Sequence, residues 1–178
     1  MDTIVKYMIE RKWADDEKTD RKVFLWNLAR KSREEKEVSH KIGGMLIYNQ
    51  LIEEFLKDIT ELSVNYVKAE IWPADVCLKL DFSKMTFGKL INEFKQYATI
   101  EHNREILLEY LHKYNLKRNE VVHNLFGIED LEKLAVELDE YALLADEIVH
   151  LLVEYDNSVC EKFCDLDRRV DFNDFSDF

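Results

Sequence analysis

The chain has 178 residues, 47% of them hydrophobic, and a formal net charge of −12. This length fits one domain with or without extensions, and ten Phe, eight Tyr and three Trp supply enough large side chains for a core. Only four Gly and one Pro are present, which argues against an all-β fold with its many tight turns. The negative charge argues against a protein that coats DNA or RNA, but it is compatible with an enzyme that contacts a few nucleotides.

The cysteines and the N-terminal residues indicate a reduced, cytoplasmic protein. Cys77, Cys160 and Cys164 form no paired framework and lack the spacing of a zinc site, so we expect free thiols and no metal or cofactor. The N-terminal residues have neither the apolar core nor the cleavage site of a signal peptide. No stretch approaches the roughly 20 apolar residues of a membrane span, so we expect no membrane partner.

Two helices are predicted in residues 1–39, which we assign to an N-terminal helical extension. Residues 3–13 have the apolar spacing of a short amphipathic helix, and residues 20–39 form the second. The charged run from Arg30 to Glu37 is typical of a solvated helix face, with a phosphate-binding patch as the alternative.

Residues 41–68 are predicted to form the most apolar helix, which places it in the middle of a bundle. Gly43 and Gly44 either kink this helix or let another helix approach closely. Asn49 lies within the apolar stripe and needs a polar partner. We favour a hydrogen bond to another helix, and a group directed into a functional site is the alternative.

The middle of the chain contains a long connection and three shorter predicted helices. Residues 69–85 connect to a helix capped by Ser83 or Thr86 that ends near Tyr97. A further helix covers residues 101–114, Asn115 stops it in a left-handed conformation, and a short helix runs from near Arg118 to Gly127.

The last helix is predicted over residues 128–155. Its apolar residues alternate at three and four positions, which indicates a seam for another helix of the same chain or of a second copy: Leu131, Leu134, Leu138, Tyr141, Ala145, Ile148, Leu152 and Tyr155. Residues 159–178 form an acidic C-terminal tail with regularly spaced Phe, which either stays mobile or docks on a partner.

Arg118, Asn119 and His123 suggest catalysis. Metal-free RNA cleavage needs a group that takes the 2′-hydroxyl proton, another that protonates the leaving 5′-oxygen, and a cation beside the phosphoryl oxygens. Histidine titrates near neutrality, and arginine presents a charged fork that matches phosphate. Asn119 and His123 share a helical face, whereas Arg118 lies about 140° from His123 on an ideal helix. We expect Arg118 to converge on His123 from a frayed first helical turn, and the alternative is a surface arginine beside a packed histidine.

The segment Arg118-Asn119-Glu120-Val121-Val122-His123 resembles the motif of the HEPN superfamily of helical nucleotide-binding and RNase domains, in which four to six residues separate Arg from His. Met85-Thr86-Phe87-Gly88-Lys89-Leu90-Ile91 is also similar to a segment of several HEPN-like proteins. The resemblance covers roughly residues 40–155. It implies an all-α, HEPN-like up-and-down helical bundle, which we place at residues 40–158.

The same resemblance implies a metal-independent endoribonuclease that works as a homodimer, as a toxin of a toxin–antitoxin or abortive-infection system or in antiviral defence. RNA would be the substrate, and an antitoxin or partner protein would hold the enzyme in check. By position, His123 would be the general acid/base, Arg118 the phosphate contact and Asn119 the residue that orients them. Asn49 and Glu53 match no part of the motif and are candidate neighbours of it.

Two function classes therefore follow from the sequence. The first is the HEPN-type endoribonuclease. The second is a non-catalytic HEPN-like interaction module, or an acidic inhibitor that mimics nucleic acid. The position of His123 in a dimer separates them, because the enzyme needs both copies of this side chain in one solvent-accessible cleft.

Overall fold

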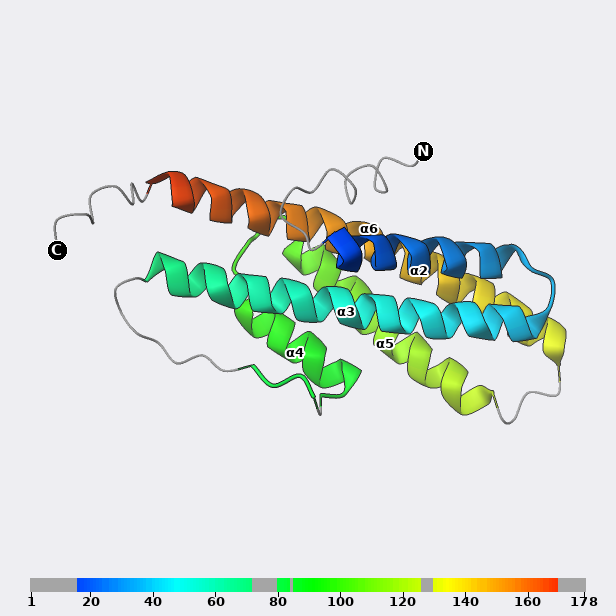
Figure 1. The fold of residues 1–178 in the computed structure, drawn as a ribbon. Coiled ribbons are helices and arrows are strands. Elements are labelled where there is room, and N and C mark those ends of the chain that lie inside the picture. The colour runs from blue at the N-terminus through cyan, green and yellow to red at the C-terminus, as the bar shows by residue number, and fades with distance from the viewer. Residues whose placement is uncertain (1–15, 72–79, 84, 126–129, 170–178) are drawn as a thin grey trace, which may run out of the picture.

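The computed structural model describes residues 16–71, 80–83, 85–125 and 130–169, and these residues contain five α-helices and no strand. The predicted helix at 3–13, Cys77 and residues 170–178 of the predicted tail lie outside this description. The all-α prediction is confirmed for the described residues (Figure 1). The helices are α2 (Asp16–Glu34), α3 (Val38–Glu70), α4 (Phe87–Tyr97), α5 (Arg104–Asn124) and α6 (Leu131–Arg169).

The two longest helices, α3 and α6, form the centre of the bundle. Helix α3 packs against α2, α4 and α6, while α5 packs against α4 and α6. In Figure 1, α2 and α3 run antiparallel, and α5 runs antiparallel to α6. Trp26 and Ala29 of α2 belong to the same buried cluster as the apolar residues of the other helices, so part of the predicted extension contributes to the common core.

The apolar pattern of α3 explains its central position. It buries residues on several sides, as predicted: Met45, Tyr48, Leu51, Ile52, Phe55, Leu56, Ile59 and Val64. The helix continues through both glycines, and Gly44 lies where α2 comes close. A Cβ atom at Gly44 would lie 2.9 Å from Ser32 Cβ and 3.4 Å from the carbonyl oxygen of Ala29. Gly44 therefore permits the close approach of two helices, which was one of the two predicted roles.

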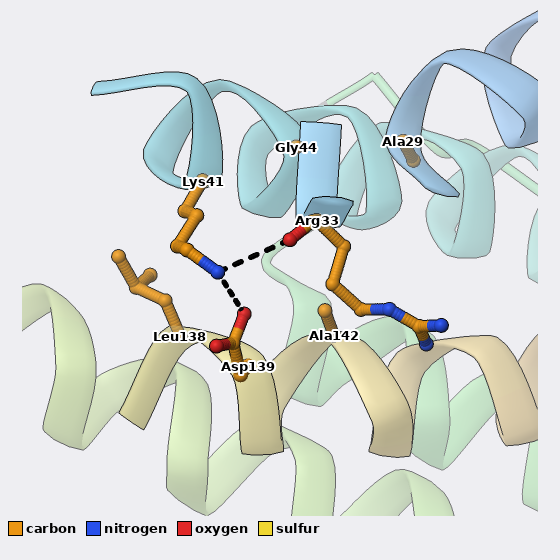
Figure 2. Close-up of a pocket in the computed structure, with 7 residues that line it drawn as sticks. All are labelled: Ala29, Arg33, Lys41, Gly44, Leu138, Asp139 and Ala142. Atoms are coloured by element: carbon orange, nitrogen blue, oxygen red, sulfur yellow. Dashed lines mark hydrogen bonds and ion pairs between the residues drawn. The ribbon is translucent and has the colours of Figure 1, made fainter. Parts of the chain in front are cut away.

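The predicted helix over residues 20–39 is wrong at its C-terminal end. Helix α2 stops at Glu34, and Glu37 adopts an extended conformation as the N-cap of α3. Lys41 of α3 donates a hydrogen bond of 3.1 Å from Nζ to the carbonyl oxygen of Arg33 and forms an ion pair with Asp139 of α6 (Figure 2). This lysine satisfies a carbonyl at the end of α2 and links it to α6, so tertiary contacts stabilise the break.

Helix α5 is continuous from Arg104 to Asn124, so the predicted stop at Asn115 is wrong. Tyr114 and Val121 are fully buried on either side of this position, and their packing outweighs the modest helix propensity of asparagine. The left-handed asparagine is instead Asn103, with a φ of 56° at the N-cap. The predicted end at Gly127 lies outside the described residues.

Helix α6 begins at Leu131 and extends well beyond the predicted C-terminal end at residue 155. It continues to Arg169, so residues 159–169 are helical rather than part of an irregular tail. The predicted seam is buried against the same chain from Leu134 to Tyr155, whereas Leu131 at its start is 63% exposed. The seam is therefore intramolecular core, and it leaves little apolar surface there for a second copy.

Candidate functional site

Arg118 points from α5 towards α3 and α4. Its Nη2 atom lies 3.8 Å from Oε1 of Glu53, and its guanidinium carbon lies 5.3 Å from the centre of the Phe87 ring. The Arg118 side chain is 30% exposed, and its buried Nε atom has no hydrogen-bond partner among the residues that the structure describes. The cation is thus held between two other helices by a long ion pair and an aromatic face.

Asn119 and His123 lie on the outer side of α5, and both are exposed. Because α5 is a single helix, Arg118 is not in a frayed first turn, and the ideal rotation of about 140° between positions 118 and 123 applies. The expectation that Arg118 converges on His123 within one chain is therefore wrong. Asn119 and His123 still share a face, since they are one helical turn apart.

Asn49, Tyr114 and Tyr141 connect three helices in the core close to Arg118. The Tyr114 hydroxyl donates to Asn49 Oδ1 at 2.9 Å, and the Tyr141 hydroxyl donates to the same oxygen at 2.6 Å. The two phenol rings lie 4.7 Å apart between centroids. The predicted helix-to-helix hydrogen bond of Asn49 is confirmed, and it has two donors.

Burial keeps both phenols protonated. Desolvation raises the pKa of Tyr114 well above its usual value, and desolvation also raises that of Tyr141, while the nearby Arg118 cation opposes both increases. At neutral pH these hydroxyls act as hydrogen-bond donors and not as bases. Their hydrogen bonds to Asn49 therefore hold α3, α5 and α6 together around Arg118, and neither phenol serves as a proton acceptor.

Phe87, Tyr114 and Tyr141 are neighbours of Arg118 that the sequence did not predict. The spacing could have shown part of this arrangement. Tyr114 and Arg118 are four residues apart and therefore share a face of α5, and Asn49 and Glu53 share a face of α3 in the same way. Which helix faces which could not be inferred from that spacing.

A second polar cluster, which is only partly buried, surrounds Asp146 of α6. Its Oδ1 atom accepts hydrogen bonds from Trp26 Nε1 at 2.7 Å and from the Tyr48 hydroxyl at 3.0 Å. Arg30 and His150 also lie near this carboxylate, at 4.0 and 3.9 Å. Arg30 belongs to the charged run at the end of α2, which was predicted to be a solvated helix face. At this position the run also contacts another helix of the protein. The cluster ties α2 and α3 to α6.

The described residues provide no other obvious binding site. They contain no group of three His, Cys, Asp or Glu side chains that could hold a metal ion. The hollow in Figure 2 lies between α2, α3 and α6, and the ammonium group of Lys41 is already hydrogen-bonded and ion-paired there. None of the helices within this part of the chain combines the length and apolar character that a membrane span requires.

Comparisons of the chain with protein-family models, with curated proteins and with solved structures find no match.

Proposed function

We propose that this protein is a metal-independent endoribonuclease of HEPN type whose active site forms between two copies of the chain. The observation that carries the proposal is the exposure of His123 and Asn119 on one face of α5. A catalytic imidazole must reach solvent and substrate, and this position allows both.

The proposed chemistry is transesterification at a ribose 2′-hydroxyl. One His123 takes the 2′-hydroxyl proton as the oxygen attacks phosphorus, and the bond from phosphorus to the 5′-oxygen breaks. The other copy of His123 protonates that leaving oxygen, so a 2′,3′-cyclic phosphate and a 5′-hydroxyl result. Asn119 orients the imidazole, and Arg118 stabilises negative charge on the phosphoryl oxygens.

The geometry of α5 makes the second copy necessary. Arg118 and His123 of one chain point in different directions, so an Arg118 that serves His123 must come from the other subunit or leave its place beside Glu53. The ion pair with Glu53 is long, at 3.8 Å, and about a third of each side chain reaches solvent, so Arg118 has room to leave this place. A toxin or antiviral role, with an antitoxin or partner protein that restrains the enzyme, is part of this proposal.

The test is RNA cleavage in EDTA by the wild type and by His123→Ala, Arg118→Ala and Asn119→Ala. We expect the His123 variant to lose at least about a hundredfold in rate, since general acid–base groups contribute that much or more. His112→Ala is the matched control, because His112 is also an exposed histidine of α5. Equal cleavage by the wild type and His123→Ala, or no cleavage by either at any RNA tested, refutes the proposal.

A second candidate is a non-catalytic helical interaction module. The packing of Arg118 between Glu53 and Phe87 favours it, because an arginine that links helices within one subunit needs no substrate. The net charge of −12 would suit a basic partner or mimicry of nucleic acid. On this reading Arg118→Ala lowers the melting temperature, His123→Ala changes nothing, and the wild type cleaves no RNA.

A further inference from the structure

Helix α2 packs against α3 and α6 alone among the described helices, and it buries few of its own side chains (Figure 1). Within its described residues the buried side chains are Trp26 and Ala29, whereas Phe24 and Leu28 are 64% and 39% exposed. Helix α4 is shorter, with 11 residues against the 19 of α2, and it buries four large apolar side chains. Apolar burial therefore contributes less to the docking of α2 than to that of α4.

Basic residues of α2 face carboxylates of α3. Arg21 Nη2 lies 3.1 Å from Oε1 of Glu54. Asp58 lies between two lysines, with its Oδ2 atom 2.6 Å from Lys22 Nζ and its Oδ1 atom 3.9 Å from Lys18 Nζ. In each pair at least one side chain is more than a third exposed. Such ion pairs stabilise little and are weakened by salt, so these contacts can open while the rest of the bundle stays folded.

The surface beneath α2 combines carboxylates with aromatic rings. Trp26 donates from Nε1 to Asp146 Oδ1 at 2.7 Å, and Arg30 Nε lies 4.0 Å from the same oxygen. Lys22 Nζ lies 4.3 Å from the centre of the Phe55 ring. We call this surface the α2-binding face, and its residues on α3 and α6 are Tyr48, Glu54, Phe55, Asp58 and Asp146. It suits a helix that presents cations together with an indole.

We propose that α2 is a releasable helix, and that the α2-binding face is a docking site for a basic amphipathic helix of a partner protein. The partner helix would carry cations at the positions of Arg21 and Lys22 and an aromatic donor at that of Trp26, because α2 itself shows which chemistry this face accepts. Residues 35–37 connect α2 to α3, so a released α2 stays tethered and competes with the partner as an intramolecular ligand. The net charge of −12 attracts a basic partner.

Hydrogen exchange of the full chain, followed by mass spectrometry, tests the release of α2. We expect amides in the middle of α2 to have protection factors at least about tenfold lower than those in the middle of α3. Raising NaCl from 0.1 to 1 M shortens the Debye length from about 10 to about 3 Å and should lower the protection of α2 but not of α3. Asp58→Asn should lower it about fivefold, since two lysines lose their partner. Glu140→Gln is the matched control, because Glu140 pairs with Lys117 of α5, outside the α2-binding face.

A synthetic peptide with the sequence of residues 16–34 tests the docking site. It is titrated into the wild type and into the double variant Arg21→Glu, Lys22→Glu, whose own α2 is repelled by Glu54 and Asp58 while the α2-binding face is unchanged. We expect the peptide to bind the double variant at least about tenfold more tightly than the wild type, because the intramolecular competitor is weakened. The same peptide with both charge reversals is the matched control and should bind neither protein.

Each measurement has a result that overturns the inference. Protection of α2 equal to that of α3, without a response to salt, shows that α2 is not released separately. A double variant that loses more helix by circular dichroism than α2 contains shows the same, because the bundle then depends on α2. A peptide that binds the double variant no more tightly than the wild type, or a charge-reversed peptide that binds as well, rules out the docking site. Neither measurement involves RNA, so the outcome is independent of the proposed ribonuclease activity.

Discussion

Replacing Asn49 by leucine tests whether the polar link between α3, α5 and α6 stabilises the fold. In the wild type, the Tyr114 and Tyr141 hydroxyls both donate to Asn49 Oδ1. Asn49 is 7% exposed and both tyrosines are fully buried, so water cannot replace the lost acceptor. Leucine branches at a similar position and fills the space with apolar atoms, which separates the loss of the acceptor from the creation of a cavity.

The expected cost follows from the number of unpaired groups. A buried donor without an acceptor costs about 1–3 kcal/mol. Two donors lose their acceptor here, but one phenol can donate to the other because the ring centroids lie 4.7 Å apart. We therefore expect Asn49→Leu to lower the free energy of unfolding by about 2–4 kcal/mol. This is a large share of the roughly 5–15 kcal/mol that stabilises a typical domain.

Urea unfolding followed by circular dichroism measures this effect. The triple variant Asn49→Leu, Tyr114→Phe, Tyr141→Phe is the control, because it removes the donors together with the acceptor. It should recover most of the lost stability. If Asn49→Leu costs less than about 1 kcal/mol, the hydrogen bonds contribute too little to support the argument. If the triple variant is as unstable as the single one, unpaired hydroxyls are not the cause of the loss.

The two adjacent glycines and a buried tyrosine yield the remaining predictions. Gly44→Ala should destabilise the protein by about 1–3 kcal/mol, because its Cβ would lie 2.9 Å from Ser32 Cβ, whereas Gly43→Ala meets nothing within 4 Å and should stabilise α3 by about 0.5–1 kcal/mol. Thermal unfolding of both variants checks this, and the opposite order of melting temperatures contradicts the close approach of α2. Burial raises the pKa of Tyr155 to about 12, so the unfolded chain releases the phenol proton near pH 10 while the folded chain retains it. The stability from this group is complete below pH 10 and declines above it by up to about 1.4 kcal/mol per pH unit. Urea unfolding between pH 8 and pH 11 should therefore show a shallower decline for Tyr155→Phe, and an unchanged slope would show that this phenol does not titrate as described.

Local patterns predicted the elements whose apolar residues repeat regularly. The seam of α6 was recognised from steps of three and four residues, and its residues from Leu134 to Tyr155 are buried. Helix α4 ends at Tyr97 as expected, with Thr86 at its N-cap position. The buried Asn49 needed a partner because an unpaired amide in a core is costly, and it has two.

Elements that depend on distant contacts were predicted less well. Asn115 resembles a helix stop in the local sequence, yet α5 continues through it because Tyr114 and Val121 are anchored in the core. Helix α2 ends earlier than its own residues suggest, since Lys41 binds its last turn and Asp139 of α6 at once.

The sequence by itself determined that the chain is helical, which stretches are apolar, and that Arg118, Asn119 and His123 lie within a few residues of one another. Only the tertiary structure decided that α5 is unbroken, so that Arg118 faces Glu53 while His123 faces solvent. The physical reason is that periodicity is a property of neighbouring residues. The environment of a side chain is set by helices far away in the chain, as Asn49 and Tyr141 show across 92 positions.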